Sequence, residues 1–212
     1  MGRQLLIWGA GGHAKVVSEI AHATGWEVYG YVDSDSRRVG ELVKPGGAAI
    51  LYDSAALFRI LERKRRPFAA VSLAFGDNDA RLQAAERLRG EIDLPALVHP
   101  SAVLSPSCSI GAGSVVMPRV VVNAQARVGV AAILNTGCIV EHDCLVGDGV
   151  HVSPHATLAG AVTVGACSWI GAGATVIQGI TIGSSTTVGA GAVVIRDAGD
   201  NLTLVGSPAR PV

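Results

Sequence analysis

The sequence predicts two architectures in one chain: an α/β domain over residues 1–97 and an all-β parallel β-helix of hexapeptide repeats over residues 98–212. Three observations support this division. Strand-like and helix-like segments alternate in the first part, and an aliphatic residue recurs at every sixth position in the second. Residues 1–97 also carry 25 charged side chains, whereas residues 98–212 carry nine. We therefore place the domain boundary just before His99 and Pro100.

The first part has the pattern of a parallel sheet whose faces are covered by helices. Its length is too small for both mononucleotide-binding halves of a dinucleotide fold, so we expect a half-Rossmann domain that binds one nucleotide. The expected strands are 5–8, 27–32, 68–74 and a short one within 94–98, and the expected helices are 15–23, 54–63 and 78–89.

A glycine-rich turn follows the first expected strand. Gly9, Gly11 and Ala14 fit a relaxed form of the phosphate-binding fingerprint. Together with Gly12, these glycines would let phosphate approach the backbone at a helix N-terminus. Asp33 ends the second strand, where its carboxylate could accept hydrogen bonds from a ribose or a base. The alternative is a tight turn with a purely structural role.

In the second part, the aliphatic residue recurs at every sixth position without exception, and neither a helical nor a strand period explains a strict period of six. The pattern is typical of a β-helix built from hexapeptides. Glycine follows the aliphatic residue at intervals of 18, which predicts triangular coils of three hexads. The seventeen aliphatic positions are Val98, Leu104, Ile110, Val116, Val122, Val128, Leu134, Val140, Val146, Val152, Leu158, Val164, Ile170, Val176, Ile182, Val188 and Val194.

The cluster around His142 is the strongest candidate for chemistry. This histidine should point out of the prism, and Glu141 and Asp143 flank it in a domain with few charges. A neighbouring carboxylate orients an imidazole and raises its basicity. Such a pair suits a general base that deprotonates an amine or a hydroxyl before it attacks a thioester. An exposed histidine without function is the alternative.

Two further positions are placed relative to His142 by the repeat. Gly160 lies one coil further along in the same column, where a glycine leaves space and an accessible amide, although a structural corner glycine is the alternative. His151 lies half a coil away and belongs to another face. The two histidines could therefore share a site only across a subunit interface.

The hexads, together with four motifs, resemble one family. These motifs are the turn at 9–17, the Phe-Gly-Asp-Asn sequence at 75–78, the segment 135–144 and the ending at 205–210. The family is the sugar O/N-acyltransferases with a left-handed β-helix, and the likeness covers essentially the whole chain. Its members include bacillosamine-type and perosamine N-acetyltransferases and sialic acid O-acetyltransferases.

The resemblance implies a left-handed helix, a homotrimer, and acetyl-CoA bound between neighbouring prisms. It makes His142 the general base and Asp143 its partner. By the same resemblance, the Gly160 amide contacts the acetyl oxygen and His151 helps to hold the acetyl donor or the acceptor.

Two more roles come from the resemblance alone: Asn135 contributes a polar contact and His13 reaches toward the sugar. Gly9, Gly11, Gly12 and Asp33 then bind the nucleotide of the substrate.

We therefore predict an acetyl-CoA-dependent N-acetyltransferase that acts on a nucleotide-linked 4-amino-4,6-dideoxy sugar in surface polysaccharide biosynthesis, by direct transfer. A sialic acid or other sugar O-acetyltransferase is an alternative. His142, His151 and His155 raise another, a trimeric metalloenzyme of the carbonic anhydrase type, but their spacing argues against it and we expect no metal. The choice between nitrogen and oxygen, and between UDP, GDP and CMP, stays open.

The composition argues against nucleic acid and membranes as partners. The chain has 17 basic and 17 acidic residues, so its net charge gives no attraction to nucleic acid or to anionic membranes. No apolar run is long enough to span a bilayer. The first residues also lack a signal-peptide pattern, and we expect a cytoplasmic protein.

Overall fold

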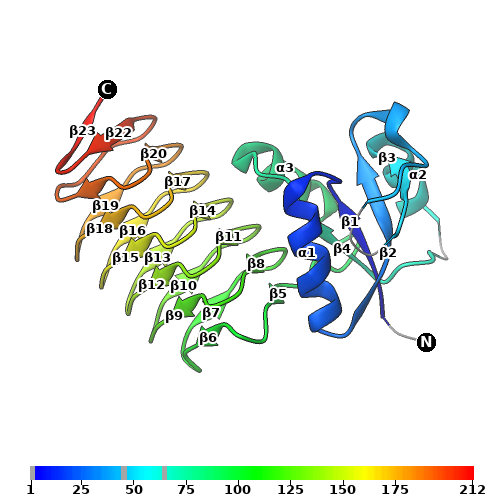
Figure 1. The fold of residues 1–212 in the computed structure, drawn as a ribbon, viewed down its shortest axis with the longest axis horizontal. Helices are drawn as coiled ribbons and strands as arrows, with labels where there is room; N and C mark the ends of the chain where they lie inside the picture. The colour runs from blue at the N-terminus through cyan, green and yellow to red at the C-terminus, as the bar shows by residue number, and fades with distance from the viewer. Residues whose placement is uncertain (1–2, 44–46, 64–65) are drawn as a thin grey trace.

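The computed structural model describes residues 3–43, 47–63 and 66–212. It confirms the predicted fold class, because an α/β part is followed by a left-handed parallel β-helix (Figure 1). The C-terminus lies at the end of the prism that is distant from the α/β part. In the described part of the chain, no helix has the length and apolar character needed to cross a membrane.

The α/β part is built on a parallel sheet in the order β3-β2-β1-β4. Alternate residues of the first strand point to opposite faces, as the pleat requires. Leu5 packs with α1, whereas Leu6 packs with α2 and α3. The elements are β1 (Arg3–Trp8), α1 (Gly12–Ala23), β2 (Trp26–Asp33), η1 (Ser36–Arg38), β3 (Ile50–Asp53), α2 (Ser54–Leu61), β4 (Ala70–Leu73) and α3 (Asn78–Leu88).

This part differs from the expectation in several places. Helix α1 begins at Gly12 rather than at Lys15, and η1 was not predicted. Strand β3 was not predicted, because its short apolar run follows a glycine-rich stretch and looks like a loop. The strand expected within 94–98 is β5 (Leu97–Val98), and it pairs with β8 of the β-helix rather than with the α/β sheet. The reason is that Val98 is already the first aliphatic position of the hexad series.

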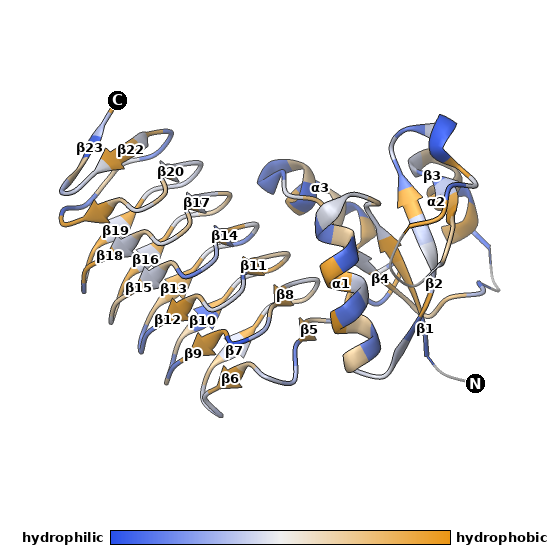
Figure 2. Ribbon diagram, viewed as in Figure 1, coloured by the Kyte–Doolittle hydropathy of each residue, from blue (hydrophilic) through white to orange (hydrophobic). Residues whose placement is uncertain are grey.

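The β-helix consists of three stacked sheets, which we call the β12, β13 and β14 sheets after a central strand of each. From β5 to β21, partners in neighbouring coils are 18 residues apart, as Ile133 with His151, so the predicted triangular coil is confirmed. The last coil is shorter, and Thr187 pairs with Thr203. Apolar residues mark many of its strands, while hydrophilic residues cover η1 and much of α3 (Figure 2). Its strands are β5 (Leu97–Val98), β6 (Val103–Leu104), β7 (Ser109–Ile110), β8 (Val115–Val116), β9 (Val121–Val122), β10 (Arg127–Val128), β11 (Ile133–Leu134), β12 (Ile139–Val140), β13 (Leu145–Val146), β14 (His151–Val152), β15 (Thr157–Leu158), β16 (Thr163–Val164), β17 (Trp169–Ile170), β18 (Thr175–Val176), β19 (Thr181–Ile182), β20 (Thr187–Val188), β21 (Val193–Val194), β22 (Thr203–Gly206) and β23 (Ala209–Pro211).

The glycine column at one corner is explained by close packing. A Cβ on Gly111 would lie 2.3 Å from the Gly129 carbonyl oxygen, and one on Gly165 would lie 2.4 Å from the Ser184 amide nitrogen. The left-handed backbone conformation instead falls two residues later in most hexads, and it is adopted by non-glycine residues too, among them Asp143 with φ of 60°. Stacked coils therefore approach too closely for a side chain at this column.

Candidate active site

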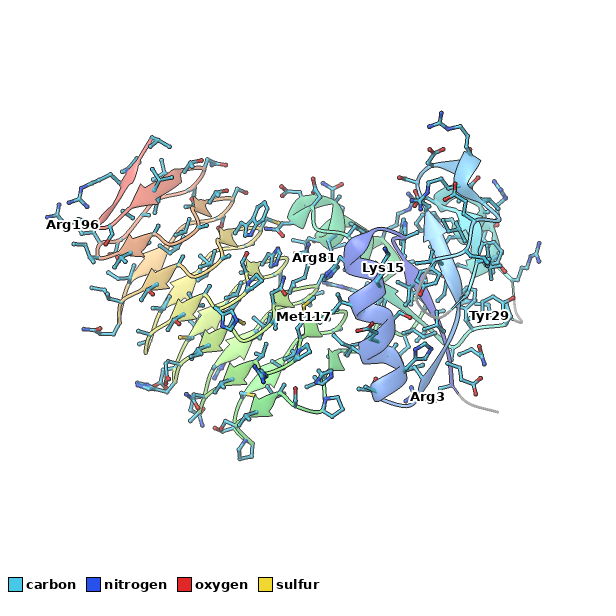
Figure 3. All side chains as sticks on the ribbon, in the orientation of Figure 1. Arg3, Lys15, Tyr29, Arg81, Met117 and Arg196 are labelled. Atoms are coloured by element: carbon cyan, nitrogen blue, oxygen red, sulfur yellow. The ribbon has the colours of Figure 1, made fainter. Side chains whose placement is uncertain are left out.

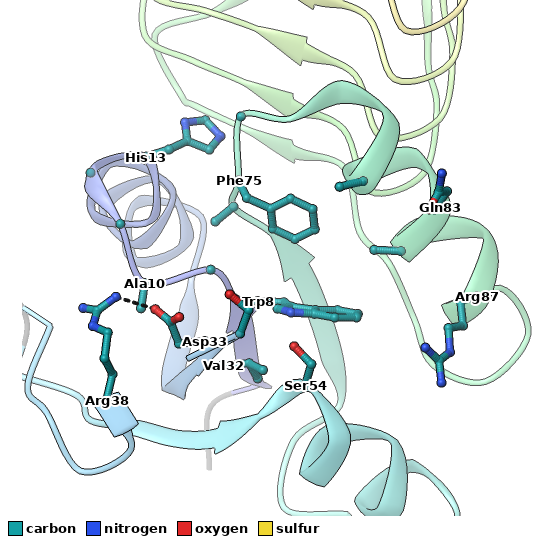
Figure 4. A pocket seen from close by; sticks show the side chains of 18 residues that line it. Trp8, Ala10, His13, Val32, Asp33, Arg38, Ser54, Phe75, Gln83 and Arg87 are labelled. Carbon is teal, nitrogen blue, oxygen red and sulfur yellow. Dashed lines mark hydrogen bonds and ion pairs between the residues drawn. The ribbon is translucent and has the colours of Figure 1, made fainter. Parts of the chain in front are cut away.

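A cavity of about 770 Å³ lies in the α/β part at the carboxyl ends of its strands (Figure 4). The predicted turn lines it with Gly9, Gly11 and Gly12. Gly9 has a φ of 122°, and a Cβ there would lie 2.4 Å from the Ala74 carbonyl oxygen, so only glycine fits. No side chain caps the N-terminus of α1. The first amides of this helix can therefore bind an anion such as phosphate.

Asp33 lines the far side of this cavity, away from the β-helix. Its Oδ1 accepts a hydrogen bond from the Asp35 amide at 2.9 Å, and its Oδ2 pairs with the Arg38 guanidinium. Figure 4 shows this pair beside the glycine turn. Sequence reasoning placed Asp33 here but missed Arg38, since nothing local marks a residue five positions away as its partner. The cavity thus offers both a carboxylate and a cation at this end.

The cavity also has an aromatic wall that the sequence did not indicate. The Trp8 and Phe75 rings lie 6.0 Å apart in an edge-to-face arrangement. The Trp8 ring meets Phe58 in the same way at 5.5 Å, and the Arg87 guanidinium carbon lies 3.5 Å from the Phe58 ring centre. Aromatic and cationic groups of this kind suit a planar base.

His13 lies on the side of the cavity that faces the β-helix (Figure 4). Burial first, and the Arg81 charge second, lower its pKa from 6.5 to about 4. The same two causes, followed by the charge on His13, lower the pKa of His151 to about 4. The two rings are therefore close enough to influence each other, and both are neutral at physiological pH.

His151 is held on the outer face of the β14 sheet. Its Nε2 accepts a hydrogen bond from Asn135 Nδ2 at 3.0 Å. Its ring stacks on Trp169 with ring centres 5.5 Å apart and an angle of 7° between the planes. Because Nε2 is an acceptor in a neutral ring, Nδ1 carries the proton. The predicted residues His13, Asn135 and His151 thus gather on one side of the prism.

His142 and Asp143 form a second group. His142 Nδ1 lies 2.8 Å from Asp143 Oδ2, and both side chains are about 60% exposed. Backbone hydrogen bonds hold this corner to both neighbouring coils, from the Asp143 amide to the Ala124 carbonyl and from the Ala161 amide to the His142 carbonyl. The carboxylate therefore orients the ring through Nδ1 and leaves Nε2 free to take a proton.

Gly160 lies directly against this imidazole, as its column position predicts. A Cβ on Gly160 would lie 2.6 Å from both Nε2 and Cε1 of His142. The other flanking acid, Glu141, is engaged elsewhere, since its Oε2 accepts a hydrogen bond from Asn123 Nδ2 at 2.8 Å. The ring is thus oriented by Asp143 and accommodated by the absence of a side chain at Gly160.

The two groups lie on different sides of the prism. His142 occupies the corner between the β12 and β13 sheets, whereas His151 lies on the β14 sheet, opposite that corner. His155 occupies a third place, where its ring packs over Gly137. Within one chain, the histidines of the β-helix therefore do not converge on one point.

Comparison with known proteins gives consistent matches. Residues 4–88 match the PglD N-terminal domain family. The UDP-N-acetylbacillosamine N-acetyltransferase of Bacillus subtilis is 40% identical over 116 residues. That match covers 54% of this chain and spans about half, 51%, of the relative.

Solved structures match over the whole length. Perosamine N-acetyltransferase from Caulobacter crescentus, a histidine-to-asparagine variant in complex with CoA and GDP-perosamine, is 40% identical. Its TM-score is 0.91, with 99% of this chain and 96% of the other covered. The acetyltransferase domain of PglB from Neisseria gonorrhoeae, in complex with acetyl coenzyme A, is also 40% identical, with a TM-score of 0.88 and full coverage of both chains.

Proposed function

The chain belongs to the family of sugar O/N-acyltransferases with a left-handed β-helix, and from this we propose that it transfers acetyl from acetyl-CoA to the amino group of a nucleotide-linked 4-amino-4,6-dideoxy sugar. The observation that carries the proposal is the whole-length match to an enzyme bound to CoA and GDP-perosamine. The glycine-lined cavity supports the nucleotide part, because free helix amides favour phosphate.

The chemical step uses His142 as the general base. The amine nitrogen attacks the thioester carbonyl while His142 Nε2 takes the proton that the amine sheds. The carbon–sulfur bond then breaks, and the histidine returns the proton to the departing thiolate of CoA. The Gly160 amide donates to the carbonyl oxygen as negative charge develops on it.

Transfer is direct, without an acyl-enzyme. The thiol nearest in sequence to His142 is Cys144, which is buried, and burial is the first cause that raises its pKa. Its Sγ lies 3.1 Å from the Ala159 carbonyl oxygen, facing the interior of the prism. A protonated, inward thiol is a poor nucleophile.

The neutral rings of His13 and His151 hold the sugar, with Asn135 adding a polar contact. Each ring has a buried nitrogen without a hydrogen-bond partner among the described residues, Nε2 of His13 and Nδ1 of His151. A buried polar atom of this kind is costly until a ligand satisfies it. Sugar hydroxyl or amino groups are suitable partners.

The working unit is a homotrimer. His142 lies opposite the face that carries His151, so a complete site needs His142 from a neighbouring chain. Apolar side chains exposed on the prism also favour contact between copies: Leu145 and Trp169 are each 47% exposed. The reaction would supply an N-acetylated nucleotide sugar to surface polysaccharide biosynthesis, in the cytoplasm where acetyl-CoA is available.

The test is CoA release with UDP- and GDP-linked 4-amino-4,6-dideoxy sugars, compared with free sialic acid. We expect turnover with at least one of the nucleotide amino sugars and none with sialic acid. Turnover with sialic acid alone would overturn both the nucleotide and the amine parts of the proposal.

A further inference from the structure

Arg81 is a buried cation between α3 and the β-helix (Figure 3). It is 1% exposed, and the acceptors of its hydrogen bonds are carbonyl and amide oxygens. Burying a guanidinium is expensive unless its donors are hydrogen-bonded. Because the acceptors of Arg81 belong to two different domains, the geometry of its donors fixes how these domains meet.

Arg81 and Asn78 together bind three successive coils at one corner. Arg81 Nε donates to the Ala131 carbonyl at 2.8 Å and Nη2 to the Gly149 carbonyl at 2.7 Å. Asn78 Nδ2 donates to the Cys167 carbonyl at 3.0 Å, and its Oδ1 accepts from Arg81 Nη2 at 2.7 Å. The three acceptors are spaced by 18 residues, so these two side chains follow the coil period.

These carbonyls are the ones that the coil-to-coil hydrogen bonds leave over. At this corner, the amide of each residue in the left-handed conformation donates to a carbonyl of the previous coil. That carbonyl belongs to the residue just before the left-handed residue of the previous coil. Gly149, for example, donates to Val130 and not to Ala131. Arg81 and Asn78 thus satisfy acceptors that the repeat itself does not use.

The other edge of the guanidinium holds the wall of the nucleotide cavity. Arg81 Nη1 donates to the Phe75 carbonyl at 3.0 Å and to the Gly76 carbonyl at 3.2 Å. Both residues line the cavity, and the Phe75 ring meets Trp8 there. One planar group therefore joins the cavity to the corner where the β13 sheet meets the β14 sheet, which carries His151.

We propose that Arg81, assisted by Asn78, is a positioning residue that sets the distance between the nucleotide cavity and the face of the β14 sheet that carries His151. A sugar anchored by its nucleotide can reach the thioester only if this distance is held. The inference rests on the proposed acetyl transfer. The rigid fork of arginine makes bidentate contacts that lysine does not reproduce.

The experiment compares Arg81→Lys and Arg81→Met with Arg89→Ala, which removes an exposed arginine near the end of the same helix. We expect kcat with saturating acetyl-CoA and nucleotide amino sugar to fall on the order of 10²-fold in both Arg81 variants, as for a small misplacement of reactants. Affinity for GDP or UDP alone should change less than about threefold, because the phosphate site at the glycine turn and the N-terminus of α1 makes no contact with Arg81. Arg89→Ala should match the wild type.

Hydrogen exchange provides a readout that does not need turnover. In both Arg81 variants, amides of residues 75–78 should exchange faster than in the wild type, with the β-helix strands unchanged. A lysine variant with wild-type kcat, a parallel loss of nucleotide affinity and kcat, or unchanged exchange at 75–78 would each overturn the assignment. If the wild type transfers no acetyl, the proposed function fails, while the exchange result still decides whether Arg81 holds the cavity wall.

Discussion

The α/β part and the β-helix carry their functional groups in opposite ways. In the α/β part, the cavity is completed within one chain by residues from several elements, such as Gly9, Arg38 and Phe75. In the β-helix, the scaffold repeats, and the two residues proposed to act on the substrates, His142 and His151, lie on different sides of the prism. If the proposed function holds, nucleotide binding needs one chain alone, whereas acetyl transfer needs two prisms placed side by side.

The largest effect should come from His142, the proposed general base. Replacing His142 with Ala should lower kcat by roughly 10²–10⁴-fold, the range for loss of a general base. Because the side chain is 60% exposed, the melting temperature should hardly change. Steady-state kinetics with both substrates saturating would measure this.

His22→Ala is the matched control, since His22 is an exposed histidine in the last turn of α1. It should retain wild-type turnover. Near wild-type turnover in His142→Ala would instead exclude His142 as the base. It would also remove the reason to place acetyl transfer between two chains.

A smaller effect is expected from Gly160→Ala. The new methyl group would lie 2.6 Å from the His142 ring, which must then turn away from Asp143. We expect kcat to fall by about 10–10²-fold with little change in nucleotide affinity. Gly199→Ala, where a Cβ meets no atom within 4 Å, should be neutral in kcat, and an unaffected Gly160→Ala enzyme would contradict the assigned geometry.

The matching test in the α/β part is Gly9→Ala. Its Cβ would collide with the Ala74 carbonyl, and its φ of 122° is strained for alanine, so the cavity floor must move. We expect the KM for the nucleotide sugar to rise about tenfold and the KM for acetyl-CoA to stay constant. Gly25→Ala shares a positive φ of 82° but has open space, and it should leave both KM values unchanged.

The neutral histidines between the two parts predict a pH effect on stability. Both have folded-state pKa values of about 4, below the ordinary 6.5. At pH 5 the unfolded chain therefore binds protons that the folded chain does not. The free energy of unfolding should fall from pH 7 to pH 5, by on the order of 1–2 kcal/mol for each histidine. Urea unfolding at both pH values would measure it.

His151→Gln is the corresponding variant, and it should lose less stability between these pH values than the wild type does. His22→Ala should show the wild-type dependence. An equal dependence in the wild type and in His151→Gln would mean that His151 is not held in its neutral form.

The two parts also differ in how much their sequence predicts. The period of six places the inward residues, and it brings Gly160 beside His142 because neighbours in these coils are 18 residues apart. The contacts of Arg81 have no such rule, since its acceptors lie 50 and 68 residues away. The approach of His13 to His151 likewise depends on the packing of α1 against the β-helix. Contacts within the repeat can be predicted from a fixed spacing in the sequence, whereas contacts between the two domains cannot.

The most direct test of the shared site is complementation between two inactive chains. One chain carries His142→Ala, and the other keeps His142 but carries His13→Ala with His151→Ala. Co-expressed with different tags and purified as mixed trimers, they should recover acetyl transfer to the nucleotide amino sugar at about a third of the sites, because each mixed trimer contains one interface that joins the two intact halves. Mixed oligomers as inactive as either parent would show that the site lies within one chain and would contradict the account.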